Sequence, residues 1–361
     1  MSEDEQVSRW SNAFRQFGEL ECRGLSDLYE RLALGVSDDI ELLRWFANAS
    51  GPRTNANQLF AAVHYLLLRG ARHEISQFYP TLTPAPLPSR DAYPAFHNFC
   101  MEHENEVAAV IRQRTTQTNE VSRCTYLLPA LVTAGLVSSA PLHLIDVGTA
   151  SGMNLLFDRY HYDYGDGTTC GAQDSTVRLR TELRGKRPPI APIPSITARV
   201  GIDLNPIDAN DAEATGWLRA CVWPEHVERF RSLESALEVV REVRPNIVKG
   251  NAVELLPRVV KEAGSGSTVV VIHTNVLPYF SADERSRWRD LLQEIGSSRN
   301  LIWLAAEADS LLTAVGFCGL DAGRAASRTA LPLAMVSFIE GQRTDRLLAL
   351  TGAHGRWLEW I

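Results

Sequence analysis

The stretch LIDVGTASGMNLL (residues 144–156) decides the fold. An apolar run, LHLIDV (142–147), carries Asp146 near its end and leads into Gly148, Ala150 and Gly152, after which apolar residues resume. This pattern predicts a buried strand, a tight turn and an apolar helix. Glycine has no side chain, so such a turn lets backbone N–H groups approach a ligand closely. We expect a nucleotide-binding turn here; a tight turn without a ligand is the alternative.

A second acidic strand end follows in VGIDLNPID (200–208), where Asp203 closes the next apolar run. An acid at this place accepts hydrogen bonds from ribose hydroxyls, and a compact unit puts it about 20 residues after the glycine turn. Here it comes much later, so we expect an insertion over residues 157–197. The alternative is that Asp203 caps a helix or marks a turn.

Two further strand ends carry polar residues. Asn251 and Ala252 follow the run NIVKG (246–250), where an amide side chain could meet an adenine amine. His273 and Asn275 stand at the end of TVVVIH (268–273), where open α/β sheets place their ligands. An ordinary strand-to-helix turn at Asn251 and a buried, satisfied histidine at His273 are the alternatives.

Apolar runs and amphipathic helices alternate through the second half of the chain. Short β-rich runs occur at 142–147, 198–203, 246–250, 268–273 and 300–306, with helices predicted at 225–243 and from Ser281 to Gly296. This alternation predicts an α/β fold: a Rossmann-like, doubly wound, mostly parallel sheet. Runs at 333–339, 346–350 and 356–361 predict an antiparallel C-terminal hairpin. We expect a helical N-terminal domain over residues 1–137 and the Rossmann-like domain over 138–361.

Composition narrows the class of protein. Hydrophobic residues make up 45% and charged residues 22% of the 361, which allows a large core. The net charge of −7 disfavours a nucleic-acid partner. The six cysteines are scattered, which predicts neither a metal site nor disulfides and fits a reducing cytoplasm. The start MSEDEQ does not look like a signal peptide, and no apolar run is expected to cross a membrane.

Taken in order, these four strand ends resemble the class I S-adenosylmethionine-dependent methyltransferases. The resemblance implies that the first turn holds the methionine part, Asp203 the ribose, and the Asn251 turn the adenine. Ala150 stands where many members have a glycine, and the second acid arrives late. The cofactor-binding residues expected are Asn119, Asp146, Gly148, Ala150, Ser151, Gly152, Asn154, Asp203, Leu204, Asn251, Ala252, His273 and Asn275.

A second resemblance covers nearly the whole chain. Four segments, at 57–70, 99–124, 144–165 and 218–239, look like a bacterial family classed as a domain of unknown function. The resemblance implies a helical N-terminal region joined to a methyltransferase-like core, and it implies no reaction.

The segment TQTNE (116–120) precedes the first strand, where such segments often cover the site. Thr118, Asn119, Glu120 and Arg123 could reach over the cofactor. The alternative is a helix start capped by Thr118. The sequence WPE at 223–225 is expected to open a helix, with Pro224 in its first turn.

The reaction expected first is methyl transfer to a small molecule. Alignment supplies most of the catalysis, and a base is needed only when the nucleophile must lose a proton. His273, Glu120 and His161 are the candidate bases.

The insert FDRYHYDYG (157–165) suggests a rival reaction. Tyr160, Tyr162 and Tyr164 alternate, and aromatic faces attract a sulfonium cation. A pocket sealed by these rings would favour cyclisation of the cofactor to azetidine-2-carboxylate and methylthioadenosine. A hairpin packed on the sheet is the structural alternative, and a cofactor-binding protein without catalysis is a third function.

Overall fold

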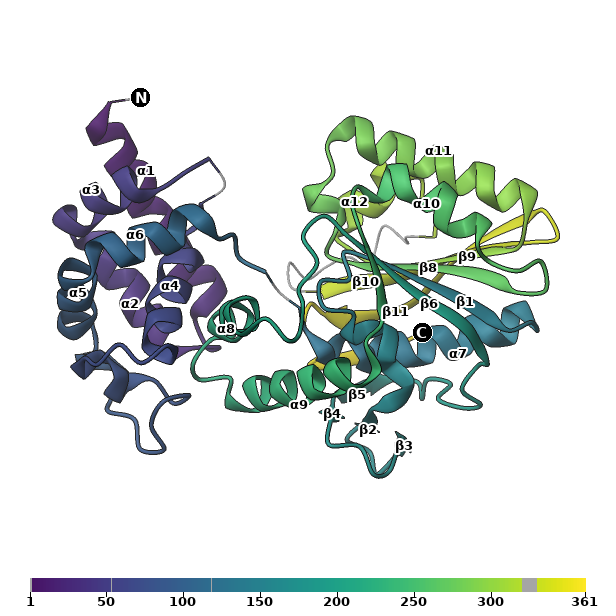
Figure 1. The fold of residues 1–361 in the computed structure, drawn as a ribbon, viewed down its shortest axis with the longest axis horizontal. Coiled ribbons are helices and arrows are strands. Elements are labelled where there is room, and N and C mark those ends of the chain that lie inside the picture. The colour runs from purple at the N-terminus through teal and green to yellow at the C-terminus, as the bar shows by residue number, and fades with distance from the viewer. Residues whose placement is uncertain (1, 53, 118, 320–329) are drawn as a thin grey trace. The chain divides into compact units, whose positions relative to one another are not determined.

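The computed structural model describes residues 2–52, 54–117, 119–319 and 330–361. The chain forms two compact units (Figure 1). The helical unit comprises Met1–Thr118 and Asn210–Arg231, and the sheet unit comprises Asn119–Ala209 and Ser232–Ile361. The helical unit thus includes a later segment of the chain, residues 210–231.

The helical unit is a bundle with an aromatic core. The ring of Phe14 meets those of Phe46 and Phe60 edge to face, with centroid distances of 5.1 and 5.8 Å, respectively. Each is fully buried. Its elements are α1 (Glu3–Gln16), the π-helical η1 (Phe17–Cys22), α2 (Asp27–Asp38), α3 (Ile40–Ala49), α4 (Ala56–Leu68), the 3-10 turns η2 (Glu74–Phe78) and η3 (Ser89–Asp91), α5 (Tyr93–Glu102), α6 (Glu104–Gln113) and α8 (Ala212–Ala220).

Helix α8 joins this bundle through buried polar contacts. Trp217 Nε1 donates a 2.8 Å hydrogen bond to the carbonyl of Thr115. His64 on α4 lies 3.2 Å from the carbonyl of Ala220 and 2.8 Å from Thr81 Oγ1. Burial lowers the pKa of His64 to about 4, so the ring is neutral at neutral pH. The predicted helix start at Pro224 is later in the structure, where α9 begins at Val227.

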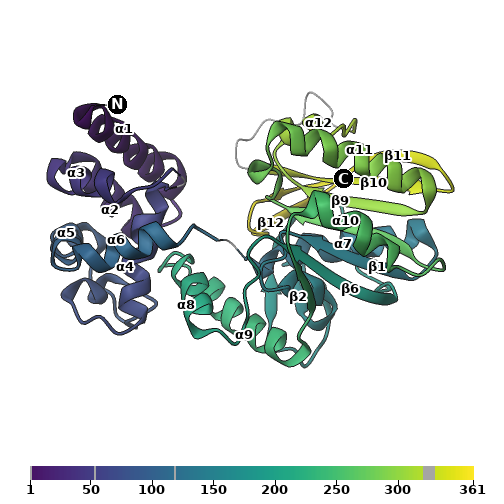
Figure 2. The same ribbon diagram turned by 45° about the horizontal axis from the view of Figure 1, so that its top comes forward.

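The sheet unit is built on nine strands in the order β5-β12-β11-β10-β9-β8-β1-β6-β7. The five strands from β7 to β9 are parallel, and β10, β11 and β12 add antiparallel pairings, which Figure 2 shows beside β9. The predicted parallel sheet and antiparallel C-terminal hairpin are confirmed. The strands are β1 (Leu142–Val147), β5 (Glu182–Gly185), β6 (Ile196–Asp203), β7 (Asn246–Lys249), β8 (Thr268–Thr274), β9 (Leu301–Ala306), β10 (Ala330–Ile339), β11 (Gln342–Gly352) and β12 (Trp357–Trp360).

Helices cover both faces of this sheet (Figure 1). One face carries α10 (Ala252–Lys261) and α11 (Ala282–Ser298), whose apolar residues share a core with β1, β8 and β9. The other face carries α7 (Cys124–Ser138). The remaining helices are η4 (Val121–Arg123), α9 (Val227–Val243), η6 (Leu277–Tyr279) and α12 (Asp309–Ala314). Helix α11 begins with a capping box: Ser281 N donates to Glu284 Oε2 and Glu284 N to Ser281 Oγ.

The first crossover, from β1 to β6, departs from the expected pattern. The apolar residues after Gly152 form a 3-10 helix, η5 (Met153–Arg159), that is kinked at Leu156, and not an α-helix. The chain then builds a small sheet in the order β3-β2-β4, from Thr169–Gly171, His161–Asp163 and Arg178–Arg180. Strand β5 pairs with β12 at the far edge of the main sheet. The predicted insertion at 157–197 thus replaces the usual crossover helix.

Helix α7 belongs to a long apolar stretch, whereas the sequence predicts no apolar run that could cross a membrane. The stretch Val121–Ser138 is long and apolar enough to cross a membrane by length and composition, and 72% of it is buried inside the protein. A core helix passes the same test. Its burial against the sheet explains the uniform apolarity.

Candidate functional site

The order of the parallel strands identifies the edge formed by their carboxyl ends, at β1 and β8, as the place where a ligand would bind. Numbered 1 to 5 in chain order, the parallel strands β1, β6, β7, β8 and β9 lie across the sheet in the order 3-2-1-4-5. The strand order therefore reverses between β1 and β8. Ligands of open α/β sheets bind beyond the carboxyl ends of the strands at such a reversal. Val147 of β1 lies opposite His273 of β8 at this edge.

The turn after β1 has an unusual backbone. Gly148, Ala150 and Gly152 have φ values of 72°, 51° and 86°, in the left-handed region that side chains disfavour. The N–H groups of Gly148 and Thr149 both donate to the carbonyl of Ile202, at 2.8 and 3.4 Å, and Gly152 N donates to Thr149 O. Most of the turn's donors are therefore used within the protein, and the turn is fixed against β6.

Asp203 is the partner that completes this turn. Its carboxylate accepts 2.8 Å hydrogen bonds from the backbone N–H of Ala150 on one oxygen and of Asn205 on the other. A carboxylate has about four lone-pair sites, so each oxygen retains one for a ligand hydroxyl. Leu204, the next residue, is 59% exposed. An apolar side chain thus stands in solvent beside the acid.

Asp146 supplies a second carboxyl group at this edge, and it is only 2% exposed. Its Oδ2 accepts a 2.8 Å hydrogen bond from Thr149 Oγ1. Burial raises the pKa of Asp146 to about 7, and the charge of Asp203 adds to this, while the Thr149 bond and the charge of Arg123 oppose it. The group therefore titrates near neutral pH.

Residues before β1 close on the same turn. Ser151 Oγ donates to Asn119 Oδ1 at 2.7 Å, and Asn119 Nδ2 donates to the carbonyl of Thr149 at 3.3 Å. Asn119 therefore contacts the glycine turn, and its binding of a cofactor stays a prediction. Thr118 lies outside the described residues.

Arg123 and Glu120, in the same segment, are both buried. Arg123 Nη1 donates to the carbonyl and to Oγ1 of Thr274, at 3.2 and 3.0 Å, at the end of β8. Glu120 is 5% exposed and its Oε1 accepts from Ser122 N at 3.1 Å. The segment before β1 therefore reaches both strand ends that flank the reversal.

Asn154 and Asn251 serve mainly the local structure. Asn154 is 5% exposed, and its Oδ1 lies 3.5 Å from Cys124 Sγ. Asn251 caps α10, since its Oδ1 accepts from Val253 N at 2.8 Å while its Nδ2 donates to Glu284 Oε1 at 2.8 Å. Both polar ends of the Asn251 side chain are occupied. Ala252, buried at 7% exposure, is the first residue of α10.

His273 does not have the geometry of a general base. The ring is 1% exposed, and Trp303 Nε1 donates to its Nε2 at 2.8 Å. Its Nδ1 therefore carries the proton and donates to Glu307 Oε1 at 2.8 Å. A base must reach its substrate with a free lone pair. The catalytic prediction for His273 is corrected to that of a satisfied core histidine.

The tyrosines of the insert lie in the core. Tyr160, Tyr162 and Tyr164 are at most 1% exposed. Their hydroxyls donate to the backbone carbonyls of Met153, Phe157 and Thr125, respectively. Because both the rings and the hydroxyls are used internally, the predicted catalytic role of Tyr160 and Tyr162 and the sulfonium lid are corrected to a packed hairpin. The third candidate base, His161, is 8% exposed in β2.

Sequence reasoning missed Glu307, a fully buried carboxylate directly after β9. Besides His273 it accepts hydrogen bonds from the backbone N–H groups of Val276 and Leu277, at 2.7 and 3.3 Å. The signal was present: an acid ends the apolar run NLIWLAA, as Asp146 ends its own run. Thr274 was missed as well, because a threonine at a strand end has no distinctive pattern.

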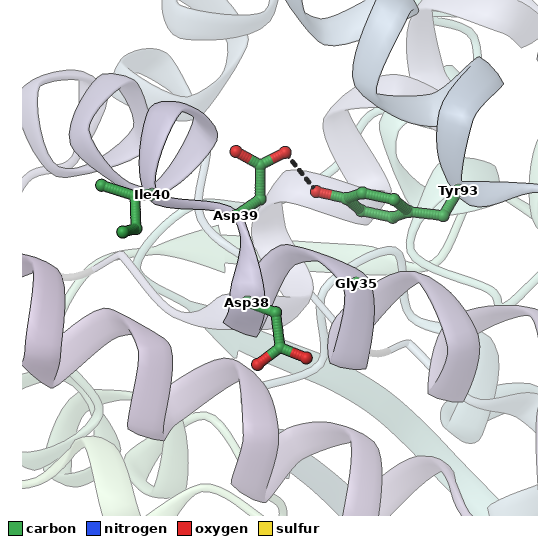
Figure 3. A pocket seen from close by; sticks show the side chains of 5 residues that line it. All are labelled: Gly35, Asp38, Asp39, Ile40 and Tyr93. Carbon is green, nitrogen blue, oxygen red and sulfur yellow. Dashed lines mark hydrogen bonds between the residues drawn. The ribbon is translucent and has the colours of Figure 1, made fainter.

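The helical unit has an open hollow of about 520 Å³ (Figure 3). Asp39 is its centre, accepting 2.7 Å hydrogen bonds from Tyr93 Oη and from His97 Nδ1 and capping α3 through Leu42 N. Partial burial opposes ionisation of Asp39, yet these bonds lower its pKa. The Asp39 carboxylate is thus already bound by groups of the protein: Tyr93, His97 and the N–H of Leu42. The lining residues are Gly35, Asp38, Asp39, Ile40 and Tyr93, none of them a predicted site residue.

Comparison with known proteins gives a family and no activity. No curated protein matches the chain. A family model described as "Uncharacterized protein conserved in bacteria (DUF2332)" matches residues 11–360, and so spans both units. The chain belongs to this uncharacterised bacterial family, DUF2332.

Proposed function

We propose that the protein is an S-adenosylmethionine-dependent enzyme, and that it transfers the methyl group to a small molecule in the cytoplasm. The observation that carries the proposal is the joining of two acidic strand ends by one left-handed turn, through the hydrogen bond from Ala150 N to Asp203. This turn stands at the reversal of strand order, the usual ligand position in such sheets.

The residues present fit the chemical parts of the cofactor. Asp203 retains acceptor sites for two ribose hydroxyls, and exposed Leu204 offers apolar surface to an adenine ring. Asp146, once ionised, would attract the positive charges of the methionine end, since opposite charges interact strongly in a buried setting. Asn251 would contribute backbone, because its side-chain amide is engaged.

The reaction would rest on alignment more than on a base. When bound, S-adenosylmethionine supplies an already activated methyl group. The polar side-chain atoms of His273, Tyr160 and Tyr162 are engaged within the core, which leaves Glu120 and His161, both also largely buried, as the candidate bases from sequence. An acceptor that needs no strong base, such as a neutral amine or a thiolate, suits this site best. Cyclisation loses its support, because the sealing tyrosines belong to the core.

The test is calorimetric titration of the purified protein with S-adenosylmethionine and S-adenosylhomocysteine, with ATP and NAD as control nucleotides. We expect a Kd of roughly 1–100 μM, or a binding free energy of about −5.5 to −8 kcal/mol, for the two sulfur nucleosides, and no binding of ATP or NAD. Absence of binding at millimolar ligand would overturn the proposal. Mass spectrometry of the products then separates the reactions. S-adenosylhomocysteine formed only with an added acceptor supports transfer, and methylthioadenosine formed without one supports cyclisation.

A further inference from the structure

Asn275, directly after β8, is held in a strained conformation. Its φ of 55° lies in the left-handed region, which asparagine tolerates better than most residues but still disfavours. Such conformations persist where the surrounding structure over-determines them, and they gather at functional sites. Asn275 is half-buried at the edge where the strand order reverses, and its side-chain amide forms no hydrogen bond to the residues that the structure describes.

The segment Thr274–Phe280 around it is fixed at nearly every backbone group. Arg123 donates to the carbonyl of Thr274, and Asn275 N donates to the carbonyl of Ala306. Arg285 on α11 holds the far end, donating to the carbonyls of Leu277 and Phe280 at 3.1 and 2.6 Å. At the centre of the segment, the N–H groups of Val276 and Leu277 donate to the Glu307 side chain.

Glu307 is itself held in a fixed orientation. One oxygen, Oε1, receives both backbone N–H groups and the Nδ1–H of His273. Trp303 sets the His273 tautomer by donating to the other ring nitrogen. Glu307 is 0% exposed, and within the described ranges it forms no ion pair with lysine or arginine. A buried carboxylate without a cationic partner is costly, and the three hydrogen bonds to Oε1 are what offset that cost here.

The segment also contacts the glycine turn. A Cβ on Gly148 would stand 2.5 Å from Val276 Cγ2, so Val276 packs directly on the turn backbone. Displacement of Val276 would therefore change the turn that Ala150 N and Asp203 complete. The contact links the end of β9 to the end of β1.

From these contacts we infer that Glu307 is a positioning residue: it fixes the Asn275–Leu277 segment so that the Asn275 amide faces a bound ligand and Val276 supports the Gly148 turn. The ligand is the one given in the proposed function, on which this inference rests. The Asn275 carboxamide, with one acceptor and two donors, would contact a polar group of the cofactor or of the methyl acceptor.

The test compares Glu307→Asp, Glu307→Gln and Thr133→Val with wild-type protein. The shorter aspartate cannot reach both amides, whereas glutamine keeps the length and one acceptor oxygen but loses the charge that strengthens these bonds. Thr133→Val is the control, because it removes one buried hydrogen bond, from Thr133 Oγ1 to the carbonyl of Pro129 in α7, that belongs neither to the segment nor to the Glu307 network. The measurements are hydrogen–deuterium exchange of peptides covering 274–280, the Kd of S-adenosylmethionine, and the melting temperature.

We expect exchange of 274–280 and the Kd to rise about threefold in Glu307→Gln and at least tenfold in Glu307→Asp. Thr133→Val should leave both quantities within twofold of wild type. Wild-type exchange in Glu307→Gln, or an equal rise in Thr133→Val, would overturn the inference, and Glu307→Gln decides it alone if the aspartate variant does not fold. Failure of wild-type protein to bind S-adenosylmethionine would instead remove the proposed function, while the exchange data still decide the role of Glu307.

Discussion

The backbone N–H of Ala150 donates a 2.8 Å hydrogen bond to the carboxylate of Asp203, and so joins the ends of β1 and β6. Because the other Asp203 oxygen binds Asn205 N, one side chain organises two turns. Any ligand that uses the remaining lone pairs of Asp203 therefore meets a carboxylate that cannot rotate away. Pre-organisation of this kind lowers the entropy cost of binding.

Asp203→Asn should weaken S-adenosylmethionine binding at least tenfold. Charge-assisted hydrogen bonds contribute about 1.5–3 kcal/mol each, and the amide loses the charge while placing an NH₂ group where an acceptor is needed. Calorimetry gives the Kd, and circular dichroism checks that the variant is folded. Asp290→Asn on α11 is the control, since that exposed acid pairs with its neighbour Arg289 and this variant should bind as wild type. Equal affinities in the two variants would remove Asp203 from the site.

Gly152→Ala should destabilise the protein more than it changes ligand contacts. The sequence suggests that a side chain here would fill cofactor space, but a Cβ would stand 2.6 Å from Pro245 Cγ and 3.4 Å from Ile247 Cδ1. The space is taken by protein. Gly167→Ala is a matched control, because its φ of 82° imposes similar strain with nothing within 4 Å.

Urea unfolding separates the two effects at Gly152. We expect Gly167→Ala to lose about 1–2 kcal/mol from left-handed strain alone. Gly152→Ala should lose about 1–3 kcal/mol more, because overpacking adds to the strain. Identical unfolding free energies would show that Pro245 moves aside freely and that the clash has no cost.

Tyr162→Phe should lower stability without a specific effect on ligand binding. The hydroxyl is the hydrogen-bond donor to the carbonyl of Phe157, and its removal leaves that buried acceptor unsatisfied at a cost of about 1–3 kcal/mol. Tyr279→Phe, at a side chain that is 77% exposed, should leave the unfolding free energy unchanged. A tenfold loss of S-adenosylmethionine affinity in folded Tyr162→Phe would restore the aromatic insert to the site.

The main sheet could be predicted because its strands are buried on both faces. A strand such as β8, TVVVIHT, is apolar throughout, and its burial pattern leaves no other element that fits. The acids Asp146 and Asp203 were predictable for the same reason, since a charge at the end of such a run has to lie at the sheet edge.

The role of the tyrosines in the insertion could not be predicted in the same way. Tyr160, Tyr162 and Tyr164 alternate as a strand does, but alternation does not say whether the shared face meets a ligand or the underside of α7. His273 presents the same difficulty, because its partners lie 30 and 34 residues later: Trp303 in β9 and Glu307 directly after it. The residues that a side chain contacts across the fold cannot be predicted from local sequence pattern, and these contacts determine the roles of both the tyrosines and His273.

Asp146→Asn should change how stability and binding depend on pH. Burial raises the pKa of Asp146 from 3.8 to about 7, so between these values the folded state binds more protons than the unfolded state. Stability from this group is therefore complete below about pH 4 and is lost as pH rises toward 7, by up to about 4 kcal/mol. Asparagine mimics the protonated form, so urea unfolding from pH 4 to 8 should show the variant gaining on wild type across that window and running parallel above it. Affinity for cationic S-adenosylmethionine should move the other way, rising in wild type as the carboxylate forms and staying level in the variant. A stability difference that is constant across the window would mean that Asp146 ionises at its ordinary pKa and is not desolvated at the end of β1.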